Sequence, residues 1–256
     1  MKWPMSVTLI RHDTSAYNVL AAEKAKSQLY QDFLLAFEKD FSAKATKKLA
    51  LEVKEKFSLK VGDAKTPLAD EEGPQAFQTG IALNEEEDPD VIFVSPYERA
   101  VLTFDHIARG WTALKKIRPL KEERIREQGH GLALLYSDWR VFFVLHPEQK
   151  ALYELEGPYW YRWPQGENVP DVRDRNRSWL TTLTRDFAGK RILVVTHHLN
   201  ILAMRANLER FNAEEFIALD KTDKPINCGV TVYRGYPNKG KNGRLVLESY
   251  NVKHYQ

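Results

Sequence analysis

Three compact apolar runs, at residues 7–10, 91–94 and 192–195, place the strongest constraint on how this chain can fold. They are rich in β-branched residues, which is typical of buried strands. Each run ends in polar or strand-breaking residues and is followed by helix-prone sequence. Strands that alternate with helices in this way predict an α/β protein with a mostly parallel sheet covered by helices on both faces.

Apolar spacing and turn residues predict the elements around these strands. Helices are expected at about residues 29–37, 43–57, 71–83, 97–109, 169–187, 199–208 and 213–219, and further strands at 230–233 and 245–249. Helix and strand patterns both fit parts of residues 132–155. The first two helices form a predicted helical insertion at about residues 20–60, which either overhangs a site or adds cover to the core.

Composition narrows the class of protein. The chain has 256 residues, a formal net charge of +3 and one cysteine, Cys228, so it has no intramolecular disulfide. The charge is too small to indicate nucleic-acid binding, because the basic residues are spread among acidic ones. No apolar run has the length of a membrane span, and we see no secretory leader. We therefore expect one cytoplasmic domain over residues 1–256, with no nucleic-acid or membrane partner.

Polar residues follow all three runs at the point where each strand would end. Arg11 and His12 follow the first run, Arg99 lies in the first turn of the helix after the second, and His197 follows the third. In an open α/β sheet, ligands bind at the carboxyl ends of the strands, and helix N-termini favour anions. Because guanidinium groups match phosphate geometry, this pattern indicates a phosphate site, provided that the fold brings the strand ends together.

Longer segments around these residues match one family in order. RHDTSAYN resembles the RHG-x-S/T-x-x-N signature of the histidine phosphatase superfamily, which includes the cofactor-dependent phosphoglycerate mutases. TPLADEEGPQA, SPYERAVLTF, IREQGHG, WYRWPQGENVPDV, ILVVTHHLNI and NCGVTVY resemble later segments of that family, and together they span nearly the whole chain. The closest resemblance is to its phosphoglycerate mutase-like branch. It implies a three-layer α/β/α fold.

The resemblance also implies a reaction and roles for individual residues. His12 would be the nucleophile that forms a phosphohistidine intermediate, and Glu127 the general acid and then the base. His197 would be the second histidine, which donates to the phosphoryl oxygens. Arg11 and Arg99 would also be catalytic, as positive donors to the phosphoryl oxygens. The expected substrate-binding residues are Arg11, Ser15, Asn18, Arg99 and His197, with Glu167 in a supporting role.

The predicted function is hydrolysis of a small phosphomonoester. This phosphohistidine route uses no metal and no cofactor, so we expect none, and the only expected partner is the phosphorylated substrate. The sequence leaves the oligomeric state open. One alternative is a phosphoglycerate mutase, although we do not find the paired-arginine, proline-rich stretch of those enzymes after the acidic segment.

Two departures from the family keep another alternative open. Asp13 and His198 stand where the family has glycines. The alternative is a catalytically weak relative that binds phosphorylated ligands or a protein partner. We expect Asp13 to turn away from the phosphate and to cap the helix that follows it. The aromatic residues at 159–163 are expected in the core or in a pocket wall.

Overall fold

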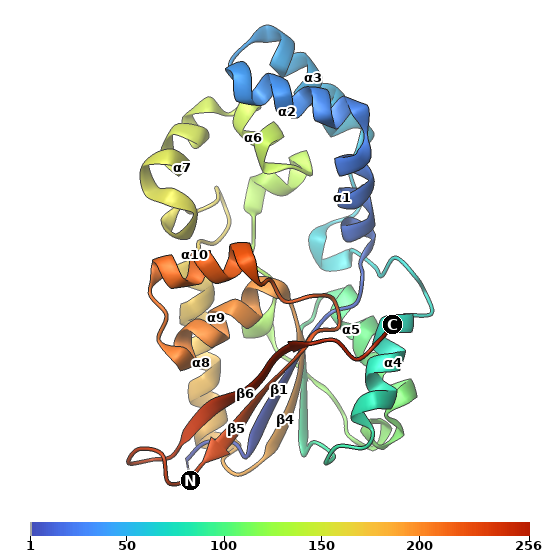
Figure 1. Ribbon diagram of the computed structural model, residues 1–256, viewed down its shortest axis with the longest axis vertical. Helices are drawn as coiled ribbons and strands as arrows, with labels where there is room; N and C mark the ends of the chain where they lie inside the picture. Colours follow the sequence, from blue (N-terminus) through green and yellow to red (C-terminus); the bar gives the residue numbers. More distant parts are fainter. Residues whose placement is uncertain (1) are drawn as a thin grey trace. The chain divides into compact units, whose positions relative to one another are not determined.

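The computed structural model describes residues 2–256. They form two compact units: residues 2–15, 64–127 and 171–256 make the first unit, and residues 16–63 and 128–170 make the second (Figure 1). The expectation of a single domain stays a prediction. The described residues contain no helix with both the length and the apolar character needed to span a bilayer.

The first unit is built on a mixed sheet. Within residues 2–256 this sheet has six strands in the order β3-β2-β4-β1-β5-β6. The strands are β1 (Ser6–Arg11), β2 (Val91–Val94), β3 (Leu120–Lys121), β4 (Arg191–Thr196), β5 (Val230–Tyr236) and β6 (Arg244–Val252). The pairs β3–β2, β2–β4 and β4–β1 are parallel, whereas β5 runs antiparallel to both β1 and β6. The predicted fold class is confirmed.

Helices cover both faces of the sheet because side chains alternate along its strands. They are α4 (Pro74–Leu83), α5 (Glu98–Gly110), α8 (Val169–Asp186) and α9 (His198–Glu209), and α10 (Ala213–Thr222) packs against α9. Ile10 and Val195 face the core with α4 and α5. Leu9 and Val194 face the opposite core, where Trp179 of α8 is fully buried. The strand ends therefore emerge between two helical layers.

The second unit is helical. It contains α1 (Ala16–Lys26), α2 (Gln28–Asp40), α3 (Lys44–Lys56), α6 (Trp139–Leu145) and α7 (Pro147–Trp160). The insertion helices thus form where they are expected, and most of residues 132–155, where helix and strand patterns both fit, is helical. Phe33, Val53 and Val141 pack in one core between α2, α3 and α6. A buried ion pair also ties α1 to the start of α6, since Lys24 Nζ lies 2.7 Å from Asp138 Oδ2.

The aromatic residues near the end of α7 mostly belong to this second core. Tyr161 is 2% exposed, and Trp163 stacks on Phe143 with ring centroids 5.9 Å apart. Trp160 differs, because it is 57% exposed. The expectation that these aromatic residues lie in the core therefore holds for Tyr161 and Trp163 but not for Trp160.

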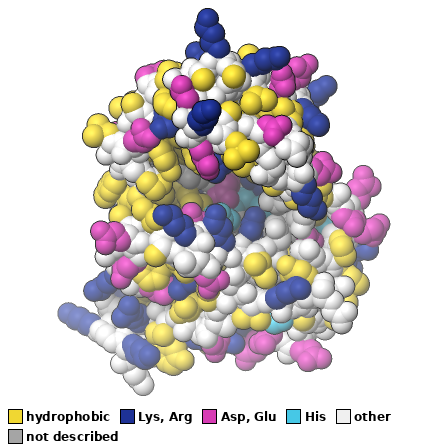
Figure 2. All heavy atoms as spheres, turned by 45° about the horizontal axis from the view of Figure 1, so that its top comes forward, with side chains coloured by type: hydrophobic (Ala, Val, Ile, Leu, Met, Phe, Trp, Pro, Cys, Tyr) yellow, Lys and Arg dark blue, Asp and Glu magenta, His cyan; other side chains and the backbone are white. Residues whose placement is uncertain are grey.

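Charged side chains are dispersed on the surface. On the face drawn in Figure 2, Lys and Arg side chains lie among Asp and Glu side chains rather than in one large patch. This distribution agrees with the small net charge of +3.

Candidate functional site

His12 lies directly after β1, and backbone bonds hold it there. Its N–H donates to the carbonyl of Thr196 at 2.9 Å, which continues the pairing of β1 with β4 by one residue. Its own carbonyl accepts from Asn227 Nδ2 at 2.9 Å. The imidazole is only 4% exposed. The ring is therefore fixed at the carboxyl end of the central strands.

One hydrogen bond determines the tautomer of His12. Nδ1 lies 2.7 Å from the backbone carbonyl oxygen of Asp13. A carbonyl oxygen can only accept, so Nδ1 must carry the proton. In the neutral ring, the lone pair is therefore on Nε2, which is the atom that could attack an electrophile.

His197 stands beside His12 at the end of β4. The two ring centroids are 5.1 Å apart, and His197 Nε2 lies 2.7 Å from Ser95 Oγ at the end of β2. Tyr97 packs edge-on against His197, and the Arg99 guanidinium lies 5.0 Å from the centroid of the Tyr97 ring. Three parallel strand ends thus bring together the residues that the sequence placed after three separate apolar runs.

Burial and positive charge both favour neutral imidazoles here. Burial, followed by the charges of Arg11 and Arg99, holds the pKa of His12 well below its ordinary value. Burial, followed by Arg99, lowers the pKa of His197 in the same way. Both rings are therefore neutral near pH 7, as a nitrogen nucleophile requires.

Two buried polar atoms of this cluster lack a hydrogen-bond partner within residues 2–256. They are Arg11 Nε and His197 Nδ1. Arg11 is otherwise oriented by a 2.7 Å bond from Nη1 to the carbonyl of Pro225. Buried polar groups are nearly always hydrogen-bonded, so two such atoms next to His12 are suited to an oxyanion that would accept from them.

Glu127 ends the segment that follows β3. Its carbonyl accepts from Arg175 Nη2 at 3.1 Å. Burial lowers the pKa of Arg11, and the negative charge of Glu127 is the largest opposing influence, so this carboxylate acts on the same group of cations. The first unit contains all five predicted catalytic residues: Arg11, His12, Arg99, Glu127 and His197.

The two residues that replace family glycines are both held by hydrogen bonds. Asp13 Oδ1 accepts from the Thr14 N–H at 2.6 Å, and Oδ2 accepts from the Ala76 N–H at 2.9 Å in the first turn of α4. Asp13 thus caps α4, and the expectation that it caps the next helix in sequence is wrong. His198 Nε2 lies 2.7 Å from Asp220 Oδ1 of α10.

The other predicted residues have different surroundings. Ser15 is buried and forms an isolated bridge with Leu68. Asn18 lies on α1 in the second unit, and its contact with substrate stays a prediction. Glu167, also in the second unit, accepts from the Gly129 N–H at 2.9 Å through Oε2.

Sequence reasoning missed several residues that orient this site. Thr103 Oγ1 accepts from the Asp13 N–H at 2.9 Å, Ser95 contacts His197, and Asn227 holds the carbonyl of His12. Ser95 had a usable signal, since it directly follows a buried strand as His12 and His197 do. Thr103 had none, because a threonine within a helix has no pattern that reveals a partner 90 residues away.

Among residues 2–256, no group of three or more His, Cys, Asp and Glu side chains is arranged to hold a metal ion. One ring nitrogen of His12 hydrogen-bonds to the Asp13 carbonyl, and one ring nitrogen of His197 hydrogen-bonds to Ser95. The metal-independent route stays a prediction.

Comparison with known proteins establishes the class to which this chain belongs. Residues 55–247 match the family model of the histidine phosphatase superfamily (branch 1), and this covers more than half of the chain. The chain therefore belongs to this superfamily, and the predicted resemblance is confirmed. Arg99, Glu127 and His197 lie inside the matched range, whereas Arg11 and His12 precede it.

Individual relatives include mutase-like proteins and phosphatases. The chain is 31% identical to the phosphoglycerate mutase-like protein AT74 of Arabidopsis thaliana over 157 residues, or 61% of this chain and 45% of that protein. It is 29% identical to phosphoserine phosphatase 1 of Hydrogenobacter thermophilus over 129 residues, or 50% of this chain and 57% of that protein. The chain thus spans about half the length of the curated relatives it matches.

Solved structures share the fold. The alpha-ribazole phosphatase of Shigella flexneri superposes with a TM-score of 0.65, and the match covers 98% of this chain and 98% of that one. The two are 17% identical, so this likeness shows the fold alone.

The lowered pKa values predict an acid-sensitive fold. An unfolded histidine takes up a proton as the pH falls below about 6.5, whereas folded His12 and His197 do so only at lower pH, so folding stability is lost in that window. We expect the free energy of unfolding to fall by up to about 1.4 kcal/mol per pH unit for each ring between about pH 7 and pH 5. Urea denaturation at a series of pH values measures this slope.

A double variant isolates these two groups. His12→Gln/His197→Gln should flatten the slope, while His254→Gln, at an exposed position, should leave it unchanged. An equally steep slope in the double variant would contradict the assignment.

The Asp13 cap makes a separate prediction. Asp13→Asn replaces one acceptor oxygen by an NH₂ group that faces a backbone N–H, so we expect a loss of about 1–3 kcal/mol in the free energy of unfolding. Turnover should barely change, because the side chain is occupied by N–H donors. Asp70→Asn, where an exposed carboxylate caps the Glu72 N–H, is the control and should cost less than about 0.5 kcal/mol. A several-fold gain in kcat/KM at unchanged stability would instead indicate that Asp13 repels the substrate.

Proposed function

We propose that this protein is a phosphatase that hydrolyses a small phosphomonoester through a phosphohistidine on His12. The observation that carries this proposal is the hydrogen bond from His12 Nδ1 to the Asp13 carbonyl, which leaves the lone pair on Nε2 of a neutral, buried ring. Membership of the histidine phosphatase superfamily supports the same reaction class.

In the first step, His12 Nε2 attacks the phosphorus in line with the leaving oxygen, so that an N–P bond forms as the P–O bond breaks. The equatorial phosphoryl oxygens need fixed donors, and Arg11 and Arg99 supply them. Arg11 Nε supports this role, because it has no hydrogen-bond partner in the described part of the chain and an oxyanion would satisfy it.

His197 donates to the same oxygens. Ser95 Oγ lies 2.7 Å from its Nε2 and is 3.4 Å from the Tyr97 N–H, which donates to it. When the Ser95 hydroxyl donates to Nε2, the proton of neutral His197 is on Nδ1. Nδ1 is buried and has no hydrogen-bond partner from any residue of 2–256. His197 then donates one hydrogen bond to the phosphoryl group without carrying charge.

Glu127 handles the protons of both steps. It gives a proton to the leaving oxygen, and in the second step it takes one from the water that attacks the phosphohistidine and releases phosphate. Its electrostatic influence on Arg11 supports a place beside the bound phosphoryl group. Ser15 and Asn18 remain proposed substrate contacts.

The geometry of Asp13 weakens the proposal of a catalytically weak binding protein. A free carboxylate near the phosphate would oppose catalysis, but both Asp13 oxygens accept backbone N–H bonds. The alternative that the protein is a phosphoglycerate mutase is supported by its similarity to the phosphoglycerate mutase-like protein of Arabidopsis thaliana. Hydrolysis is preferred because the chain shows no paired-arginine stretch after the acidic segment.

Turnover of a panel of phosphomonoesters tests this function. We expect phosphate release from p-nitrophenyl phosphate and from several small alkyl phosphates, abolished in His12→Ala and unchanged in His254→Ala. Binding of phosphate without turnover of any ester would support the binding-protein alternative. Interconversion of 2- and 3-phosphoglycerate faster than phosphate release would identify a mutase.

Chelation tests the charge-neutralising role of the arginines and histidines. If these side chains replace a metal, EDTA should leave kcat/KM unchanged. Loss of activity in EDTA that a divalent ion restores would overturn the mechanism.

A further inference from the structure

We infer that Arg175 and Thr196 are positioning residues that clamp the chain segment carrying Glu127. This segment, residues 124–127, is called the acid loop below. The inference rests on the proposed function, in which Glu127 is the proton donor. It assigns a role to side chains that the proposed mechanism does not use.

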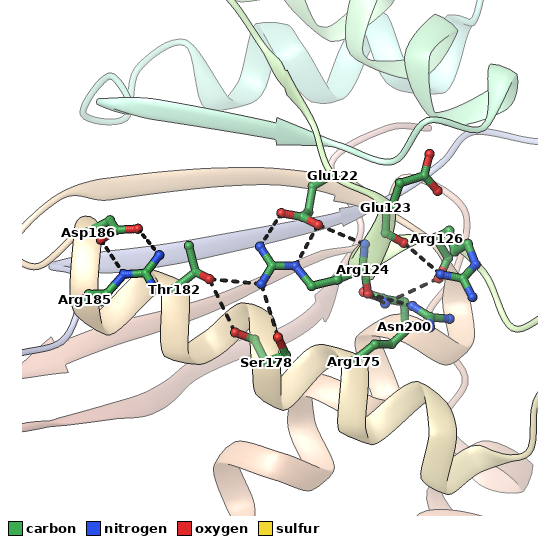
Figure 3. A network of polar contacts seen from close by, with 10 residues as sticks. All are labelled: Glu122, Glu123, Arg124, Arg126, Arg175, Ser178, Thr182, Arg185, Asp186 and Asn200. Atoms are coloured by element: carbon green, nitrogen blue, oxygen red, sulfur yellow. Dashed lines mark hydrogen bonds and ion pairs between the residues drawn. The ribbon is translucent and has the colours of Figure 1, made fainter.

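Side chains from other elements bind every carbonyl of the acid loop. Arg175 of α8 donates to the first and last of them, through Nη1 to Arg124 at 2.7 Å and through Nη2 to Glu127 at 3.1 Å. Thr196 Oγ1 donates to the carbonyl of Ile125 at 2.6 Å. Asn200 Nδ2 lies 3.4 Å from the carbonyl oxygen of Arg126. Figure 3 shows Arg175 and Asn200 beside the loop backbone.

The Arg175 fork spans the loop from end to end. Its two terminal nitrogens are fixed in one plane, so they set the separation between two carbonyls as well as their positions. The loop has little regular structure that could do this, since its first two residues end the three-residue 3-10 helix Glu123–Ile125 and the next two lie outside it. The start of the loop is also held, because the Arg124 side chain pairs with Glu122 at 2.7 Å and reaches Thr182 of α8 at 3.0 Å.

The same clamp links Glu127 to the second histidine. Thr196 directly precedes His197, and Asn200 lies three residues after it in the first turn of α9. Thr196 and Asn200 are both 0% exposed, so they cannot yield without disturbing the core. The acid loop and His197 therefore share one rigid support, which fixes where the Glu127 carboxyl sits relative to His197 and His12.

Leaving-group dependence separates positioning from a purely structural role. An alkoxide is a poor leaving group and needs a proton from a correctly placed acid, whereas p-nitrophenolate leaves as a stable anion. For a phosphohistidine route, kcat/KM reports only the steps up to loss of the leaving group. A displaced acid therefore lowers kcat/KM for alkyl phosphates selectively, while general damage lowers it for both substrates.

The experiment compares Arg175→Met with Glu127→Gln on glycerol phosphate and p-nitrophenyl phosphate. We expect Glu127→Gln to reduce kcat/KM for glycerol phosphate by about 10²–10⁴-fold and for p-nitrophenyl phosphate at least about tenfold less. Arg175→Met should show the same selectivity with a loss of about 10–100-fold, the cost of a misplacement of about 1 Å. Arg175→Lys keeps the charge, but its single nitrogen cannot reproduce the two-nitrogen fork, so it should fall between Arg175→Met and the wild type.

Two further variants keep the test decisive. Arg177→Met alters the same helix at an exposed arginine that pairs with Asp174, and it should change neither substrate. Thr196→Val removes one loop donor at nearly constant volume and should reproduce the selectivity even where Arg175→Met folds poorly.

The possible failures are distinguishable. Equal losses on both substrates in Arg175→Met and Thr196→Val, beside a selective loss in Glu127→Gln, would overturn the clamp and leave the proposed function standing. Absence of turnover by the wild-type protein would overturn the proposed function, and the positioning role of Arg175 and Thr196 would then be rejected as well.

Discussion

The parallel pairing of β1 with β4 is the contact on which the site depends. Its register sets Arg11 opposite Thr196, and the His12 N–H then continues the ladder to the Thr196 carbonyl. The two histidines that follow these strands consequently lie with ring centroids 5.1 Å apart although the chain separates them widely. Because β2 pairs with the other side of β4, Ser95 reaches His197 from the third strand end.

Desolvation and charge act in the same direction at this sheet edge. Burial removes the imidazoles from water, and the nearby guanidinium groups oppose a further positive charge, so the pKa values of both His12 and His197 are lowered. The site is thereby rich in donors while its nucleophile stays neutral. Arg11 Nε and His197 Nδ1 have no hydrogen-bond partner among residues 2–256, and an oxyanion would accept from both.

The departures from the family pattern are accommodated by new partners. Asp13 stands where the family has a glycine, and its side chain accepts hydrogen bonds from α4 and from Thr14. Its backbone carbonyl is the acceptor that orients His12. His198, the first residue of α9, contacts Asp220 of α10 and so joins these two helices. In both cases a side chain that looked like an obstacle to phosphate binding has a partner within the scaffold.

The sequence by itself determined the strands, their order along the chain and the reactive residues at their ends. Periodicity is a local property, so residues 7–10, 91–94 and 192–195 identify β1, β2 and β4 without any knowledge of their neighbours. Only the tertiary structure decided which strands pair, which tautomer His12 adopts, and that Asp13 caps α4 rather than the next helix. Arg175 and Thr196 could not be found from sequence for the same reason. Their function depends on which backbone carbonyls come within about 3 Å of them, and contacts between distant segments exist only once the sheet and its helices have packed.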